Sequence, residues 1–141
     1  IIAPKEIIEV CKKVHDFLTV GAAAPLQKAA AVGLDFDASY YKEFQEMYTR
    51  KRNLFLQGLR EAGLDFYEPQ GAYYVLVDIA KFGYESDLEF CKWLIREIGV
   101  AAVPGSSFFQ ENVQNYIRLH FAKKDETLKE ALCRLKRLKE L

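Results

Sequence analysis

The chain has 141 residues, of which half are hydrophobic, with 20 basic and 20 acidic side chains. This composition is typical of one globular domain with enough apolar material for a core. The balanced charge gives no electrostatic reason to expect a nucleic acid or a membrane as partner. No apolar run reaches the roughly 18–20 residues of a membrane span, and no signal-peptide pattern is present.

The chain opens on two β-branched residues, Ile1 and Ile2, which resemble the end of a buried strand. A natural N-terminus rarely begins in this way, so we expect a fragment, a cleaved piece or a partial record of a longer protein. Cys11, Cys91 and Cys133 lie far apart on the apolar faces of predicted helices. They favour reduced core thiols in a cytoplasmic protein over a disulfide or zinc framework.

Three helices are predicted in the first part of the chain. Pro4 suits a first helical turn, and Asp37 or Ser39 is expected to cap the long third helix, which ends before Gly63. Apolar residues recur at helical spacing in each of them. The predicted ranges are 5–18, 26–34 and about 37–62. The apolar face of the first helix predicts self-association if this piece is isolated.

From residue 64 the pattern changes to strand, strand, helix, strand, strand, helix. Ser86 and Glu89 match a capping box for the first of these helices, and Asp125 begins the last one. The predicted strands are 64–69, 72–79, 100–103 and 116–121. This order predicts an α/β (α+β) fold with helices packed on a small mixed sheet.

Arg118 is the best candidate for a ligand-binding residue. Strand alternation places it with Tyr116 and His120 on one face, opposite the apolar residues of the strand. A guanidinium on a rigid strand can bind a carboxylate through two parallel hydrogen bonds. The residues alone leave a solvated surface arginine as the more common alternative. His120 either lines the same cavity or lies on the surface, and His15 is more often a packing or surface residue.

No nucleophile motif, metal-ligand spacing or paired carboxylates support another chemistry. Two non-enzymatic alternatives stay open. One is an α/β interaction or regulatory module. The other is an RNA-binding sheet that uses Tyr73 or Tyr74. Because neighbouring strand residues point to opposite faces, only one of these tyrosines is expected to stack on a base.

Six segments, taken in order, resemble the C-terminal part of a class I/II, fold-type I aminotransferase that uses pyridoxal phosphate. They are IIAPKEIIEVCKKVH, AAAPLQKAA, RKRNLFLQGLREAG, PQGAYYVLVDI, GVAAVPGSSFF and YIRLHFAKKDETLKEALCRLKRL. The resemblance covers essentially the whole chain and is greatest to the branch that acts on kynurenine, glutamine, methionine and aromatic amino acids. It implies that residues 1–35 are the tail of the large cofactor-binding domain. Residues 36–141 would then be the interdomain helix and the small domain.

The resemblance also implies roles for particular residues. Arg118 would bind the α-carboxylate of an amino acid or a 2-oxo acid, and Tyr73 would approach the substrate side chain. Val20 and Gly21 would reach the cofactor of the neighbouring subunit in a homodimer. The Schiff-base lysine, the aspartate at the pyridine nitrogen and most phosphate contacts of the family precede this stretch. We therefore expect no catalytic residue in this chain, and no transamination by this chain alone.

Overall fold

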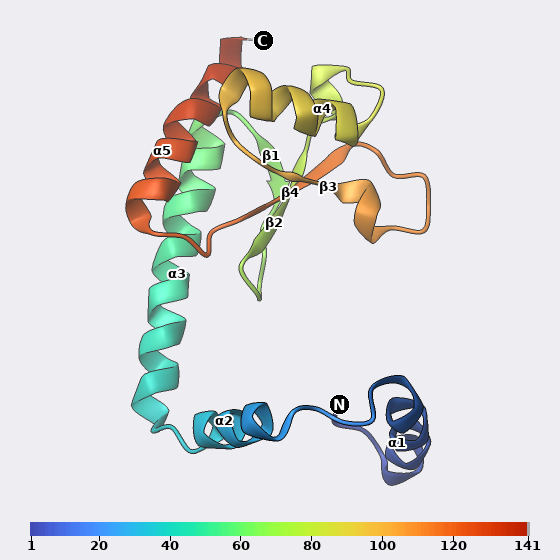
Figure 1. The fold of residues 1–141 in the computed structure, drawn as a ribbon. Coiled ribbons are helices and arrows are strands. Elements are labelled where there is room, and N and C mark those ends of the chain that lie inside the picture. The colour runs from blue at the N-terminus through green and yellow to red at the C-terminus, as the bar shows by residue number, and fades with distance from the viewer. Residues whose placement is uncertain (141) are drawn as a thin grey trace. The chain divides into compact units, whose positions relative to one another are not determined.

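The computed structural model describes residues 1–140, which divide into two units. The first unit is Ile1–Lys42, and the second begins at Glu43. The helix α3 (Ala38–Glu61) starts in the first unit and continues into the second (Figure 1). Among the described residues no helix is both long and apolar enough to cross a membrane.

The first unit consists of α1 (Lys5–Thr19), α2 (Ala24–Leu34) and the start of α3. Asp37 caps α3, because its Oδ1 accepts a hydrogen bond of 2.8 Å from the Ser39 backbone N–H. No residue of this unit is buried. Most of the large apolar residues of α1 are exposed, namely Ile7, Val10, Val14, Phe17 and Leu18.

The second unit is built on a four-stranded sheet with the order β1-β2-β4-β3 (Figure 1). The strands are β1 (Asp65–Tyr67), β2 (Tyr74–Asp78), β3 (Val103–Pro104) and β4 (Tyr116–His120). The predicted α/β (α+β) class and the order of elements are confirmed, but the expected mixed sheet is wrong because every pairing is antiparallel. The segment with helix α4 (Asp87–Trp93) connects β2 to β3. These two strands run in the same direction, but β4 lies between them. No parallel pair therefore forms.

One face of the sheet is buried against the helices of the second unit. Val75, Val77, Ile117 and Leu119 form this face. They join one apolar cluster with residues of α3, of α4 (Asp87–Trp93) with the π-helical turn that follows it, and of α5 (Asp125–Leu135). Leu128, Leu132, Leu135 and Leu138 are all buried, as the helical spacing predicted. The other face of the sheet stays half-exposed and carries Arg118.

The cysteines differ from the prediction. Cys91 is buried, and burial, with the nearby charge of Asp87, raises the pKa of its thiol to about 11. Cys11 is half-buried and Cys133 is exposed, so the prediction of three core thiols is wrong. Cys133 directly follows the buried Leu132, and one helical step turns its side chain about 100° away from the apolar stripe.

Candidate functional site

Arg118 lies in the middle of β4, between the two neighbouring strands. Its Cα pairs with that of Leu76 on β2 and with that of Val103 on β3. Its side chain extends from the half-exposed face, because Ile117 and Leu119 alternate into the core. A central strand of a sheet is a rigid base for a long side chain, so this position suits a ligand-binding guanidinium.

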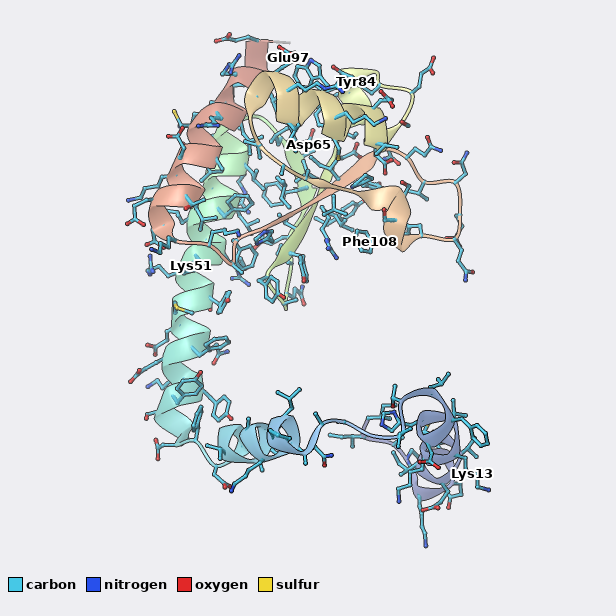
Figure 2. All side chains as sticks on the ribbon, viewed as in Figure 1. Lys13, Lys51, Asp65, Tyr84, Glu97 and Phe108 are labelled. Carbon is cyan, nitrogen blue, oxygen red and sulfur yellow. The ribbon has the colours of Figure 1, made fainter. Side chains whose placement is uncertain are left out.

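Two aromatic rings contact the guanidinium of Arg118. Its Cζ lies 4.2 Å from the centre of the Tyr74 ring and 4.0 Å from the centre of the Phe108 ring. Tyr74 belongs to β2. Phe108, which is labelled in Figure 2, ends the helical turn Gly105–Phe108 that follows β3. The rings therefore come from the two sides of β4. Cation–π contacts of this kind hold a guanidinium by its faces and leave the N–H groups at its edge available.

No carboxylate pairs with Arg118 within residues 1–140, and no hydrogen bond from its guanidinium to the protein is recorded there. Other arginines do form ion pairs, such as Arg50 with Asp125 and Arg60 with Glu68. These pairs lie elsewhere in the second unit. A half-buried guanidinium with aromatic contacts and no acidic partner is suited to bind the carboxylate of a ligand. We call Arg118, Tyr74 and Phe108 the arginine site.

Tyr73 is connected to the arginine site through Tyr74. The backbone of Ala72 has φ 56°, which ends the extended chain just before β2. The rings of Tyr73 and Tyr74 have centres 4.3 Å apart, and the Tyr74 hydroxyl donates a hydrogen bond of 3.0 Å to that of Tyr73. The expectation that these two tyrosines point to opposite faces is therefore wrong, because Tyr73 lies outside the regular strand.

The Tyr74 hydrogen bond and the proximity of the Tyr74 hydroxyl raise the pKa of Tyr73, whereas Arg118 opposes that rise. Tyr73 also lines a cavity of about 450 Å³ that contains Tyr48 and Phe121 and does not include Arg118. The ring centres of Tyr48 and Tyr73 are 6.1 Å apart. The lining of this cavity is mixed, because polar residues such as Gln45, Thr49 and Arg52 lie beside the aromatic ones. Tyr73 thus lies between this cavity and the arginine site.

His120 is on the same strand as Arg118, two residues further on. Partial burial, with the positive charges of Lys123 and Arg118, lowers the pKa of its imidazole. Strand alternation places His120 on the face of Arg118, and His120 also lines a cavity whose lining does not include Arg118. His15 is exposed and interacts with Thr19 one turn away on α1, so it has a local role.

Val20 and Gly21 belong to the first unit, whereas the residues of the arginine site belong to the second. Val20 is 85% exposed and has φ 62°, a conformation that is uncommon for a β-branched residue. A side chain added at Gly21 would meet no atom within 4 Å. Both residues are therefore accessible on this chain, and their role toward a second subunit stays a prediction.

Tyr74 and Phe108 were not identified as site residues from the sequence. Phe108 lies in one of the quoted motifs, VPGSSFF, and Tyr74 follows Tyr73 in another, PQGAYY. The missing information was the strand register, which pairs Tyr74 with His120 on the face of Arg118.

The arginine site fits a carboxylate and does not by itself fit pyridoxal phosphate. Within the described chain, the recorded contacts of Arg118 include no lysine that could form a Schiff base and no carboxylate for a pyridine nitrogen. The same residues contain no group of three or more histidines, cysteines and acidic residues arranged to hold a metal ion. Arg118 thus provides a cation for a carboxylate, and neither of the two rings in contact with it can form a Schiff base.

Comparison with known proteins gives matches along nearly the whole chain. The family described as aminotransferase class I and II matches residues 1–135. A methionine aminotransferase of Escherichia coli (strain K12) is 38% identical over 138 residues, which cover 97% of this chain and 36% of that protein. A kynurenine–oxoglutarate transaminase of Dictyostelium discoideum is 30% identical over 161 residues, which cover 99% of this chain and 37% of that protein.

Solved structures give the same result. The N-succinyldiaminopimelate aminotransferase from Mycobacterium tuberculosis superposes with a TM-score of 0.84 at 31% identity, covering 96% of this chain and 36% of that one. The chain thus spans a little over a third of the length of the relatives that it matches.

Proposed function

This chain belongs to the class I and II aminotransferases, and from that premise we propose that it supplies the site for the substrate α-carboxylate in a complete transaminase. The complete protein would exchange an amino group between an amino acid and a 2-oxo acid. Pyridoxal phosphate, the carrier of the amino group that the family implies, would be held mainly by residues outside this chain. The chain alone would not transaminate, because its arginine site has no lysine.

The observation that carries the proposal is the state of Arg118. Two aromatic rings fix its guanidinium, and no acidic side chain in residues 1–140 neutralises it. Both the amino acid and the 2-oxo acid have a carboxylate next to the reacting carbon. One arginine can therefore hold both substrates in the same orientation, which keeps the reacting carbon in place between the two half-reactions.

The proposal extends to the substrate side chain and to the assembly. The cavity lined by Tyr48, Tyr73 and Phe121 supports a substrate of the aromatic, kynurenine, glutamine or methionine type. Val20 and Gly21, which are accessible, would reach the cofactor of the neighbouring subunit in a homodimer. Residues 1–35 would be the tail of the large domain, and 36–141 the interdomain helix and small domain.

The test is Arg118→Ala in the complete protein. Arg137→Ala is the control, because Arg137 likewise has no recorded ion pair but is exposed and lies outside the arginine site. Loss of a hydrogen-bonded charge costs about 1.5–3 kcal/mol, so kcat/KM should fall roughly 10- to 150-fold. The fall should occur for the amino acid and for the 2-oxo acid alike. Unchanged kinetics in Arg118→Ala would disprove the assignment.

A further inference from the structure

We propose that Asp87 is a positioning residue for the arginine site and acts through Ser106. Asp87 would fix the turn Gly105–Phe108, and this turn places the Phe108 ring against Arg118. The inference rests on the proposed function of Arg118. It assigns a role to a buried carboxylate that neither the sequence patterns nor the arginine site itself explains.

Asp87 is the buried acidic residue of the second unit, with 1% of its surface exposed. Its two carboxylate oxygens are both used by one residue. The Ser106 backbone N–H donates to Oδ2 at 2.6 Å, and the Ser106 hydroxyl donates to Oδ1 at 3.0 Å. A carboxylate is costly to bury unless such bonds satisfy it, so the pairing specifies how α4 and the turn after β3 fit together.

The turn is also fixed from its other side, by β4. Gly105 is buried, and a Cβ atom there would lie 2.6 Å from the backbone oxygen of Tyr116 and 2.9 Å from its Cβ. Only glycine allows this approach, which brings the turn to a point two residues from Arg118. Gly105 and Ser106 therefore hold the turn between β4 and α4.

The position of the Phe108 ring depends on the attachment of this turn, because the ring itself has few recorded contacts. Phe108 is 48% exposed, and the contact recorded for its ring is the one to the guanidinium, at 4.0 Å. If the turn loses its attachment to Asp87, the ring is no longer fixed over Arg118. The guanidinium then gains rotamer freedom that binding of a carboxylate must remove, so the affinity for carboxylates falls.

The experiment measures preference for a carboxylate in the complete protein. The probes are 3-phenylpropanoate and its neutral amide, 3-phenylpropanamide, each tested as an inhibitor of transamination. The ratio of the two inhibition constants reports the charge recognition by Arg118, and a general loss of packing would weaken both inhibitors together. Ser106→Ala, Asp87→Asn and Phe108→Leu are compared with Ser106→Thr, which keeps the hydroxyl, and with Ser107→Ala.

Ser107 is the matched control, since it is the neighbouring serine and is exposed. We expect Ser106→Ala, Asp87→Asn and Phe108→Leu to lower the carboxylate preference roughly 2- to 10-fold, the effect of one hydrogen bond. Ser106→Thr and Ser107→Ala should keep the preference of the parent. Because Phe108 is half-exposed, Phe108→Leu still tests the inference if Asp87→Asn fails to fold.

Arg118→Lys separates the two possible failures. If Arg118→Lys lowers the preference but Ser106→Ala and Phe108→Leu do not, the positioning role of Asp87 is wrong and the proposed function stands. If the parent shows no preference for the carboxylate, or Arg118→Lys leaves that preference unchanged, the proposed function is wrong and the inference fails with it.

Discussion

Gly58 of α3 and Leu132 of α5 meet where the two helices cross. A Cβ atom at Gly58 would lie 2.6 Å from Cδ2 of Leu132, and both residues are buried. No side chain therefore separates the backbone of α3 from the leucine at this point. The approach allows α3 and α5 to share one apolar cluster beneath the sheet that carries Arg118.

Gly58→Ala should destabilise the protein, even though alanine favours a helix. The gain in helix propensity is about 1 kcal/mol, and overpacking of a core costs about 1–3 kcal/mol. We expect a net loss of about 1 kcal/mol in the free energy of unfolding, measured with urea. The double variant with Leu132→Ala should lose less than the sum of the single losses, because the smaller side chain makes room. Strict additivity would show that the two side chains do not compete for space.

Asp125 connects the beginning of α5 to α3 and should make stability depend on acid. Its carboxylate pairs with Arg50 and with Lys51. The hydrogen bond from Arg50 is the main cause that lowers the pKa of Asp125, and the charges of Arg50 and Lys51 add to it. A lowered pKa stabilises the folded state above the ordinary pKa, and this contribution is lost as the pH falls below about 4.

Asp125→Asn should therefore reduce Tm at pH 7 and flatten the loss of Tm between pH 5 and 3. Glu126→Gln is the matched control, because Glu126 is the next residue in the first turn of α5, is exposed and has no recorded ion pair. The control should follow the parent at every pH. If Asp125→Asn also follows the parent, the ion pairs contribute nothing to folding.

The sequence predicted those parts of the structure that depend on local periodicity. The leucine stripe of α5 and the capping of α4 by Ser86 are set by residues within a few positions of one another, and both are confirmed. Cys133 was expected on the apolar face of α5 but is exposed, because it is one position along the helix from the buried Leu132. The sheet was wrongly expected to be mixed, because strand order depends on contacts between distant segments.

The arginine site shows the same division. Strand alternation correctly placed Arg118 opposite the buried Ile117 and Leu119. Its aromatic contacts could not be predicted, because they depend on the strand register and on a turn 19 residues beyond Asp87. No sequence pattern singles out Asp87, whereas the structure buries it.

His120 should also make stability depend on pH, in a different range. Because the pKa of His120 is lowered in the folded state, the unfolded chain takes up the proton more readily. The folded state is then fully stable above the ordinary pKa near 6.5, and it loses stability as the pH falls through that value. His120→Gln should remove part of this loss.

The measurement is urea unfolding at pH 7.5 and 5.5. His15→Gln is the control, since His15 is the other histidine of the chain and is exposed on α1. The difference in unfolding free energy between the two pH values should shrink in His120→Gln and persist in His15→Gln. Equal differences in both variants would mean that His120 has the same proton affinity in the folded and unfolded chain.

The second unit should fold without the first, because the buried core is drawn from residues 55–138. No residue of 1–42 is buried, so a chain that starts at Glu43 loses no core contact. We expect such a chain to unfold cooperatively in urea with the same midpoint as the 141-residue chain. A clearly lower midpoint would show that the first unit stabilises the second.

The 141-residue chain and the chain that starts at Glu43 should differ in self-association. The apolar residues of α1 are exposed in the 141-residue chain, and a continuous apolar helix face buries itself against another copy when nothing else covers it. Size-exclusion chromatography should therefore show larger species for the 141-residue chain and a monomer for the chain from Glu43. Val14→Asp and Phe17→Asp on α1 should shift the longer chain toward monomer, whereas Lys13→Asp on the same helix should not. If all three aspartate variants behave alike, added charge and not the apolar face controls the association.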